Sequence, residues 1–181
     1  MTEPATPLVR YRLTAQIFHW VSALCVLAGV TLGIAMLNVG QGPLQNQLFD
    51  LHRSFGALIL ALTGGRLLWR LYSPPPPMLP MPAWQERAAQ VAHAALYILL
   101  FVVPLVGWAG TSAFGAQIFV FGLFNLPMIL AKDKEVADVL LPLHAALALT
   151  LCALLISHIG AAMFHHFIRK DETLKRMLPK L

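Results

Sequence analysis

Charge is scarce in this chain of 181 residues. Only 12% of its residues are Asp, Glu, Lys or Arg, whereas 58% are hydrophobic, and the mean hydropathy is +0.70. Ordinary soluble domains carry about twice that share of charged residues. The composition therefore excludes such a domain and is typical of a protein that crosses a membrane several times.

Cysteine is scarce too, and acidic residues are outnumbered. The two cysteines, Cys25 and Cys152, both fall in apolar runs, which excludes a disulfide framework and gives no zinc motif. The net charge of +5 could suggest nucleic acid as a partner. However, the basic residues lie at the ends of apolar runs rather than in one patch with aromatic residues between them. We therefore expect a lipid bilayer, and no nucleic acid, around this chain.

Four apolar runs are long enough to cross a bilayer, which takes about 20 residues of helix. They cover residues 17–39, 51–72, 91–112 and 139–167. The connection 73–82 reads SPPPPMLPMP, and proline lacks the amide donor that a helix interior needs. The stretch 113–131 is also apolar, but it contains glycine, proline and amide side chains, so we expect an interfacial or re-entrant segment there. These features predict a single all-α integral membrane domain over residues 1–181, a four-helix transmembrane bundle.

The basic residues predict which way the bundle faces. With four spans, both termini lie on one side of the membrane together with ten of the 13 Lys and Arg residues. The positive-inside rule then places both termini in the cytoplasm. A fifth span would carry the basic C-terminal tail, which includes Lys180, to the outside. Three basic residues remain outside: Arg53, Lys132 and Lys134.

Histidines recur at matched depths of the expected spans. His144 and His158 are fourteen residues apart, a spacing that returns to nearly the same helix face about 21 Å further along. His19 and His52 lie near the starts of the first two spans. Consecutive spans run in opposite directions, so the second and fourth spans both run inward while the first runs outward. His52 and His144, near the starts of the second and fourth spans, therefore lie at one depth. His19, near the inner start of the first span, lies at the depth of His158.

Ionisable side chains at such depths are costly and usually mark a functional site. A single histidine is most often a satisfied core residue, but four at two matched depths are not explained that way. Neutral imidazole is a good ligand for haem iron, and two imidazoles per iron leave no open position, which favours electron transfer. Facing helices of a bundle can supply such ligands. The spacing therefore predicts two bis-histidine haems, held by His52 with His144 and by His19 with His158.

Three residues share faces with these ligands. Gly33 lies fourteen residues after His19, which puts it on that face at the level of the outer haem, and Gly56 follows His52 by one turn. A glycine at either place could let a porphyrin approach the backbone, although packing is the commoner role. Arg66, fourteen residues after His52, could pair with a haem propionate.

Two further histidines lie near the cytoplasmic ends of the last two spans. His93 and His165 could donate to a quinone carbonyl or relay protons to it. They could equally be interfacial residues whose rings reach water. The sequence assigns no catalytic residue.

Around these residues the chain resembles the bacterial cytochrome b561 family, in particular its small diheme type that acts as a superoxide oxidase. The resemblance covers nearly the whole chain and is weakest over 113–138. The matching stretches are RLTAQIFHW, LHRSFG, GGRLLWRLYSPPPP, LPLHAALA, SHIGAAMFHHF and KDETLKRMLP.

The resemblance implies a bacterial inner-membrane protein with two b-type haems bound by the four paired histidines. It also implies that superoxide gives up electrons on the periplasmic side and that ubiquinone receives them. From charge alone, Arg53, Lys132 and Lys134 could attract the superoxide anion.

Two other functions remain open. The chain could be an electron-transfer cytochrome subunit that links the quinone pool to another redox protein, but its short loops and tails leave little room for docking, so we expect no obligate protein partner. It could also be a metal or proton transporter. A transporter would gather polar residues at one midplane locus, whereas these histidines lie at two depths and the acidic residues lie outside the spans.

Overall fold

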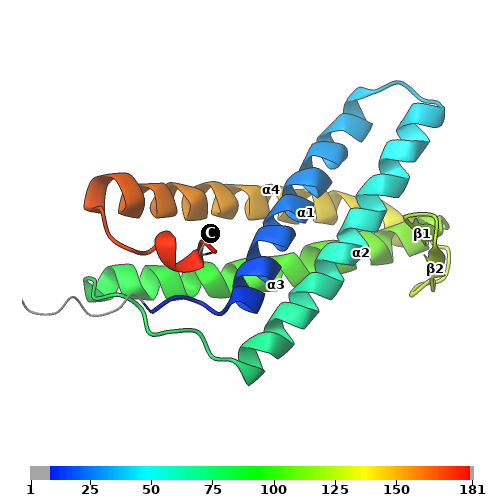
Figure 1. Cartoon of the computed structure of the whole chain (residues 1–181). Helices are drawn as coiled ribbons and strands as arrows, with labels where there is room; N and C mark the ends of the chain where they lie inside the picture. Colours follow the sequence, from blue (N-terminus) through cyan, green and yellow to red (C-terminus); the bar gives the residue numbers. More distant parts are fainter. Residues whose placement is uncertain (1–8, 180–181) are drawn as a thin grey trace, which may run out of the picture.

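The computed structural model describes residues 9–179, most of which lie in four long helices (Figure 1). Their bounds are Leu13–Asn38 (α1), Pro43–Tyr72 (α2), Ala83–Phe114 (α3) and Lys134–Met163 (α4). A π-helical turn, Phe164–Arg169 (η1), continues α4, and a 3-10 turn, Lys175–Met177 (η2), lies near the C-terminus. The expected all-helical class is confirmed, and Lys180 lies outside the described residues.

The ends of the helices follow local chemistry. Pro43 occupies the first turn of α2, where a missing amide costs nothing. Gly115 ends α3 with a φ of 89°, a conformation that glycine adopts without strain. The side chain of Asp133 accepts two backbone N–H groups of the first turn of α4. The proline-rich connection 73–82 is not helical, as its sequence predicts.

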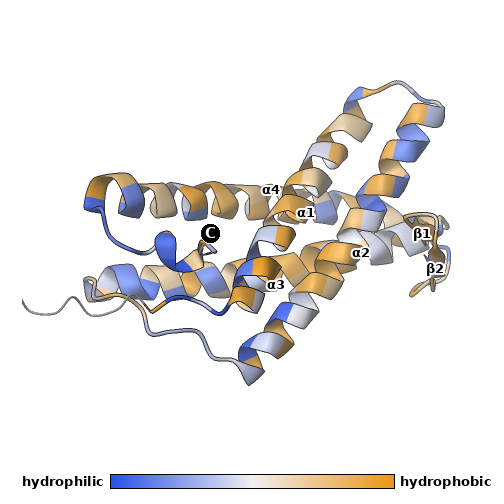
Figure 2. Cartoon of the chain, viewed as in Figure 1, coloured by the Kyte–Doolittle hydropathy of each residue, from blue (hydrophilic) through white to orange (hydrophobic). Residues whose placement is uncertain are grey.

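Three of the long helices are long and apolar enough to cross a membrane: α1, α3, and α4 with its π-helical extension. Helix α2 spans 30 residues but carries several charged residues, the blue bands along it in Figure 2. It packs against both α1 and α3, so much of its surface faces protein. On the other helices many large apolar side chains point outward, among them Leu24, Leu149 and Ile156. Such a surface suits contact with lipid.

The helices form two antiparallel pairs, α1 with α2 and α3 with α4, and the first pair crosses the second (Figure 1). Buried Leu96, Val103 and Leu151 pack between α3 and α4. The two pairs meet mainly where α2 contacts α3. Within the described residues the backbones of α1 and α4 come close to each other at few positions.

The stretch 113–131, which we expected to be interfacial or re-entrant, completes α3 and then forms a short antiparallel hairpin. Its strands are Ile118–Val120 (β1) and Phe124–Leu126 (β2). The hairpin packs on α2 through Ser54, whose buried hydroxyl donates to the carbonyl of Asp50 (2.7 Å) and accepts the N–H of Phe121 (2.9 Å). We call this end of the molecule the hairpin end, and the end with both chain termini the terminal end.

Candidate functional site

The structure brings the four histidines together as two pairs. At the hairpin end, the ring centroids of His52 and His144 are 5.9 Å apart. At the terminal end, those of His19 and His158 are 6.3 Å apart. Two imidazoles that share one metal, each with a nitrogen about 2 Å from it, place their ring centres about 6 Å apart. Both pairs, which are the ones that the depth argument joins, therefore have the separation of two ligands on one metal.

The main chain fixes both rings of the hairpin-end pair. Nδ1 of His52 lies 2.9 Å from the carbonyl oxygen of Gly29, and Nδ1 of His144 lies 2.9 Å from that of Val103. Because a carbonyl can only accept, each Nδ1 must carry the proton and donate it. The lone pair of each Nε2 is then free, which is the state in which neutral histidine binds a metal.

A cavity of about 400 Å³ opens between the helices at the hairpin end. His52 and His144 both line it, and Ile118 and Leu126 of the two strands form part of its wall. Most of its lining is apolar, with a few polar residues among it: Asn46, Arg53, Trp108 and Thr111. Such a cavity suits a flat hydrophobic ligand that carries a few polar substituents.

Glycines make room for the rings of the hairpin-end pair. A Cβ atom on Gly107 would lie 2.8 Å from Nδ1 of His144, and one on Gly33 would lie 3.1 Å from Cε1 of His52. Gly33 therefore lies at the level of this pair. Gly56 lines the cavity, although a Cβ atom there would only reach ordinary contact at 4.0 Å.

The sequence interpretation missed several residues of this site. It did not single out Gly107, which lies fourteen residues after His93. The same spacing relates His19 to Gly33, so extending that rule to the third span would have found it. Trp108, whose indole N–H donates to the carbonyl of Pro127 (3.0 Å), and the two strands carried no comparable signal.

The terminal-end pair has different neighbours. Nη2 of Arg66 lies 3.3 Å from Nδ1 of His19, and the ring of His93 is centred 5.4 Å from that of His158. A guanidinium can only donate, so in this contact Nδ1 of His19 carries the lone pair. His19 can bind a metal through Nε2 once Nδ1 takes the proton and Arg66 finds another acceptor. His19 and His158 thus fit a pair of iron ligands, provided that Arg66 gives up its hydrogen bond to Nδ1 of His19.

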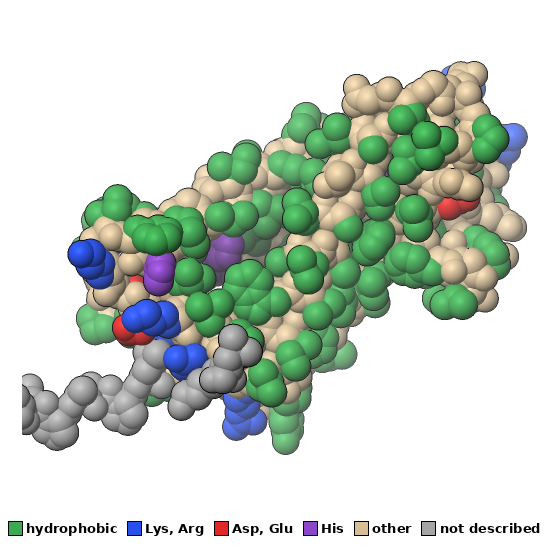
Figure 3. All heavy atoms as spheres, turned by 45° about the horizontal axis from the view of Figure 1, so that its top comes forward, with side chains coloured by type: hydrophobic (Ala, Val, Ile, Leu, Met, Phe, Trp, Pro, Cys, Tyr) green, Lys and Arg blue, Asp and Glu red, His purple; other side chains and the backbone are tan. Residues whose placement is uncertain are grey.

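His93 and His165 have separate partners. No hydrogen bond or ring contact joins them within residues 9–179. His165 instead pairs with Asp171 just beyond η1, with 2.6 Å between Nδ1 and Oδ2. Burial raises the pKa of Asp171, but hydrogen bonds from Thr173 and His165 outweigh it and hold that pKa below its ordinary value of 3.8. In Figure 3, histidine side chains reach the surface beside basic residues near the terminal end.

The three basic residues that we expected outside the membrane differ in their surroundings. Arg53 lines the cavity, and its guanidinium lies 5.2 Å from the ring of Phe49. Lys134 pairs with Asp138 on the surface of α4, and the stem of Lys132 packs against Gly115. Of the three, Arg53 is the one that lines the same cavity as a histidine pair.

Comparison with known proteins identifies relatives along nearly the whole chain. Residues 10–180 match the family described as prokaryotic cytochrome b561. Cytochrome b561 homolog 2 of Escherichia coli (strain K12) is 40% identical over 173 residues, covering 94% of this chain and 92% of that protein. Cytochrome b561 homolog 1 of the same organism is 32% identical over 176 residues, covering 94% and 98%. A Yersinia pestis protein named "Probable superoxide oxidase CybB" is 32% identical over 163 residues, covering 90% and 92%.

Proposed function

The chain belongs to the prokaryotic cytochrome b561 family, multi-pass membrane cytochromes that carry b-type haem, and we propose that it holds two such haems, one at each histidine pair. His52 and His144 would be the iron ligands at the hairpin end, and His19 and His158 those at the terminal end. The observation that carries this proposal is the occurrence of two imidazole pairs with ring separations of 5.9 and 6.3 Å. Bound this way, haem supplies one-electron transfer without an open coordination position.

Support from the chain's own residues is strongest at the hairpin end. Both rings there already donate from Nδ1 to backbone carbonyls, and the cavity between them is mostly apolar. Two glycines bring the backbone close to the rings. A transport site would need its polar groups at one locus, and the separation into two pairs argues against it.

We further propose that the protein moves electrons from superoxide to ubiquinone. Two superoxide anions each give up one electron and leave as oxygen, and ubiquinone takes both electrons and two protons to become ubiquinol. Arg53 would favour approach of the anion at the hairpin end because its positive charge lines the cavity there. The relative named as a probable superoxide oxidase supports this assignment at 32% identity.

At the terminal end, His165 is the better placed candidate to give protons to a quinone. Its contact with Asp171 would orient the ring, as a carboxylate does for a catalytic histidine. His93 would contribute from its place beside His158. With both termini in the cytoplasm of a bacterial inner membrane, superoxide would react on the periplasmic side and ubiquinone nearer the cytoplasm.

Stopped-flow mixing of the purified protein with superoxide tests this function. We expect the haem absorption bands to shift to their reduced form within the mixing experiment, and ubiquinol to form when a soluble ubiquinone is present. Superoxide dismutase, added first, should abolish both changes. Reduction that is no faster than with a control reductant would reject superoxide as the donor.

The alternative is a cytochrome subunit that links the quinone pool to another redox protein. The two Escherichia coli relatives, which are named only as cytochrome b561 homologs, leave this function open. It predicts that ubiquinol reduces the haems rapidly while superoxide does not. The same stopped-flow experiment therefore separates the two functions.

A further inference from the structure

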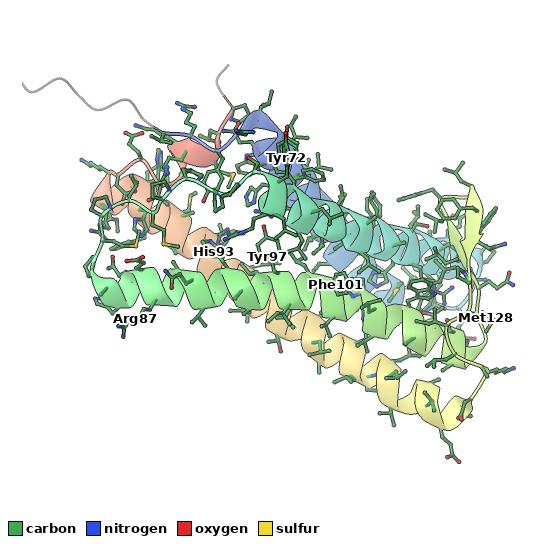
Figure 4. The ribbon with its side chains drawn as sticks, turned by 90° about the horizontal axis from the view of Figure 1, so that it is seen from below. Tyr72, Arg87, His93, Tyr97, Phe101 and Met128 are labelled. Carbon is green, nitrogen blue, oxygen red and sulfur yellow. The ribbon has the colours of Figure 1, made fainter. Side chains whose placement is uncertain are left out.

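Two arginines of α2 lie against one aromatic ring of α3 at the terminal end. Arg66 and Arg70 are one helical turn apart, and their guanidinium carbons lie 5.1 and 5.7 Å from the ring centroid of Tyr97. Figure 4 shows Tyr97 and His93 on the side of α3 that faces α2, whereas Arg87 points away from it. The two helices therefore bring two positive charges together beside the terminal-end histidine pair.

Within residues 9–179, no carboxylate neutralises this pair of charges. The acidic residues of the terminal end have other partners, since Asp171 pairs with His165, Glu172 with Lys175, and Glu86 accepts from Gln90. Arg66 makes one hydrogen bond, to Nδ1 of His19. Arg66 is half-buried and Arg70 is exposed. Two neighbouring cations repel each other, and an anion placed beside both would relieve that repulsion.

We propose that Arg66, Arg70 and the ring of Tyr97 form a cradle for the two propionate groups of the haem bound by His19 and His158. This inference rests on the proposed function. A haem carries two carboxylates, which match the two guanidinium groups in number and sign, and a guanidinium fork pairs well with a carboxylate. The Tyr97 ring would hold both forks in place through cation–π contacts.

The state of His19 supports the same assignment. Its Nδ1 now accepts from Arg66, whereas a ligand that binds iron through Nε2 needs a proton on Nδ1. A propionate gives Arg66 a stronger acceptor and releases Nδ1 of His19. Binding of the propionate by Arg66 and the release of Nδ1 of His19 for its proton would thus occur together. An anionic lipid headgroup offers similar chemistry, so the test has to distinguish the two.

The first measurement is a redox titration of variants that resolves the two haems. Arg66→Gln, Arg70→Gln and the double variant remove the charges, and Arg87→Gln removes an exposed arginine of α3 as a matched control. His158→Ala identifies which redox transition belongs to the terminal end. We expect that transition to move to lower potential, because losing nearby positive charge favours the oxidised haem. The other transition, and both transitions in Arg87→Gln, should not move.

The second measurement compares iron protoporphyrin with its dimethyl ester in protein stripped of haem. The wild type should bind the free acid at the terminal end at least about tenfold more tightly than the ester, and the double variant should bind both equally. Arg66→Lys and Arg70→Lys, which keep the charge without the fork, should retain part of this preference.

The outcomes separate the cradle from the proposed function. Unchanged potentials and equal binding of acid and ester in a wild type that holds two haems would overturn the cradle and leave the function standing. A wild type with no haem at the terminal end would overturn both. Dependence on anionic lipid vesicles without an acid preference would assign the arginines to a headgroup and reject the cradle.

Discussion

The two histidine pairs have almost the same ring separation, yet the chain holds them in different ways. At the hairpin end, both Nδ1 atoms donate to backbone carbonyls, and glycine backbone lies against both rings. At the terminal end, His19 meets an arginine and His158 lies beside a third histidine. A backbone carbonyl inside a helix is held in place, whereas an arginine or histidine side chain can rotate to another partner. The hairpin end is therefore a fixed site, and the terminal end is one where protons and charges can rearrange.

The two ends are also closed by different segments. A β-hairpin, held by Ser54, forms part of the wall of the hairpin-end cavity. At the terminal end the C-terminal tail bridges to the start of the chain, because Trp20 donates to the carbonyl of Met177 (2.9 Å) and the buried Arg176 donates to that of Val9 (2.8 Å). This tail connects α1 and α4, whose backbones come close to each other at few positions.

Removing one ligand from each pair should have the largest effect and should show whether the two sites are independent. His144→Ala should lose only the hairpin-end haem and His158→Ala only the terminal-end haem, so that each variant keeps about half of the haem per chain. Pyridine haemochrome quantitation of the purified variants measures this. Loss of both haems, or of neither, in a stable variant would contradict two independent sites.

Gly107→Ala should weaken the hairpin-end site alone. Its Cβ atom would lie 2.8 Å from Nδ1 of His144, so the ring must shift and its bond to Val103 must lengthen. Losing such a supporting hydrogen bond typically lowers metal affinity about 10–100-fold. Haem retention after transfer to an excess of apomyoglobin measures the loss. Gly64→Ala, where nothing lies within 4 Å, is the matched control, and equal retention in both variants would contradict the crowding argument.

Helical periodicity predicted the fixed features of the molecule. Helices repeat every 3.6 residues, so a fourteen-residue spacing placed His144 and His158 on one face without any knowledge of packing. The same spacing placed Gly33 on the face of His19, at the level of the other histidine pair. Apolar length and proline content likewise predicted where the long helices run. These properties depend on local sequence and on the bilayer thickness alone.

The depths of the spans predicted the two histidine pairs, but the other contacts between distant segments could not be predicted in this way. The hairpin over 118–126 has strands of three residues, too short for an alternating pattern to appear. The cation pair on Tyr97 depends on how α2 crosses α3, and the partner of His165 depends on the turn after η1. Side-chain pairing across helices is set by packing, which no single stretch of sequence encodes.

Ser54→Ala should loosen the wall of the hairpin-end cavity. Without the hydroxyl, the N–H of Phe121 loses its partner at a half-buried position, which costs about 1 kcal/mol. Thermal unfolding in detergent should show a lower Tm, with the hairpin-end haem released first. Ser157→Ala is the control, since that hydroxyl bonds only to Ala153 in its own helix. If both variants unfold alike, the hairpin does not depend on Ser54.

The smallest expected effect is on the pH dependence of stability at the terminal end. The pKa of Asp171 is lower in the folded chain than its ordinary value of 3.8, so its carboxylate stabilises the fold above that value, and the contribution is lost as the pH falls through the lowered pKa. Asp171→Asn should therefore be less stable than the wild type near neutral pH, and the gap should close below pH 3.8. Denaturation midpoints measured across this range test it. Asp138→Asn, which removes an exposed partner of Lys134 at the hairpin end, should show a smaller gap. A constant gap for Asp171→Asn at every pH would mean that its carboxylate charge contributes nothing, and the terminal end would then be no more charge-dependent than the hairpin end.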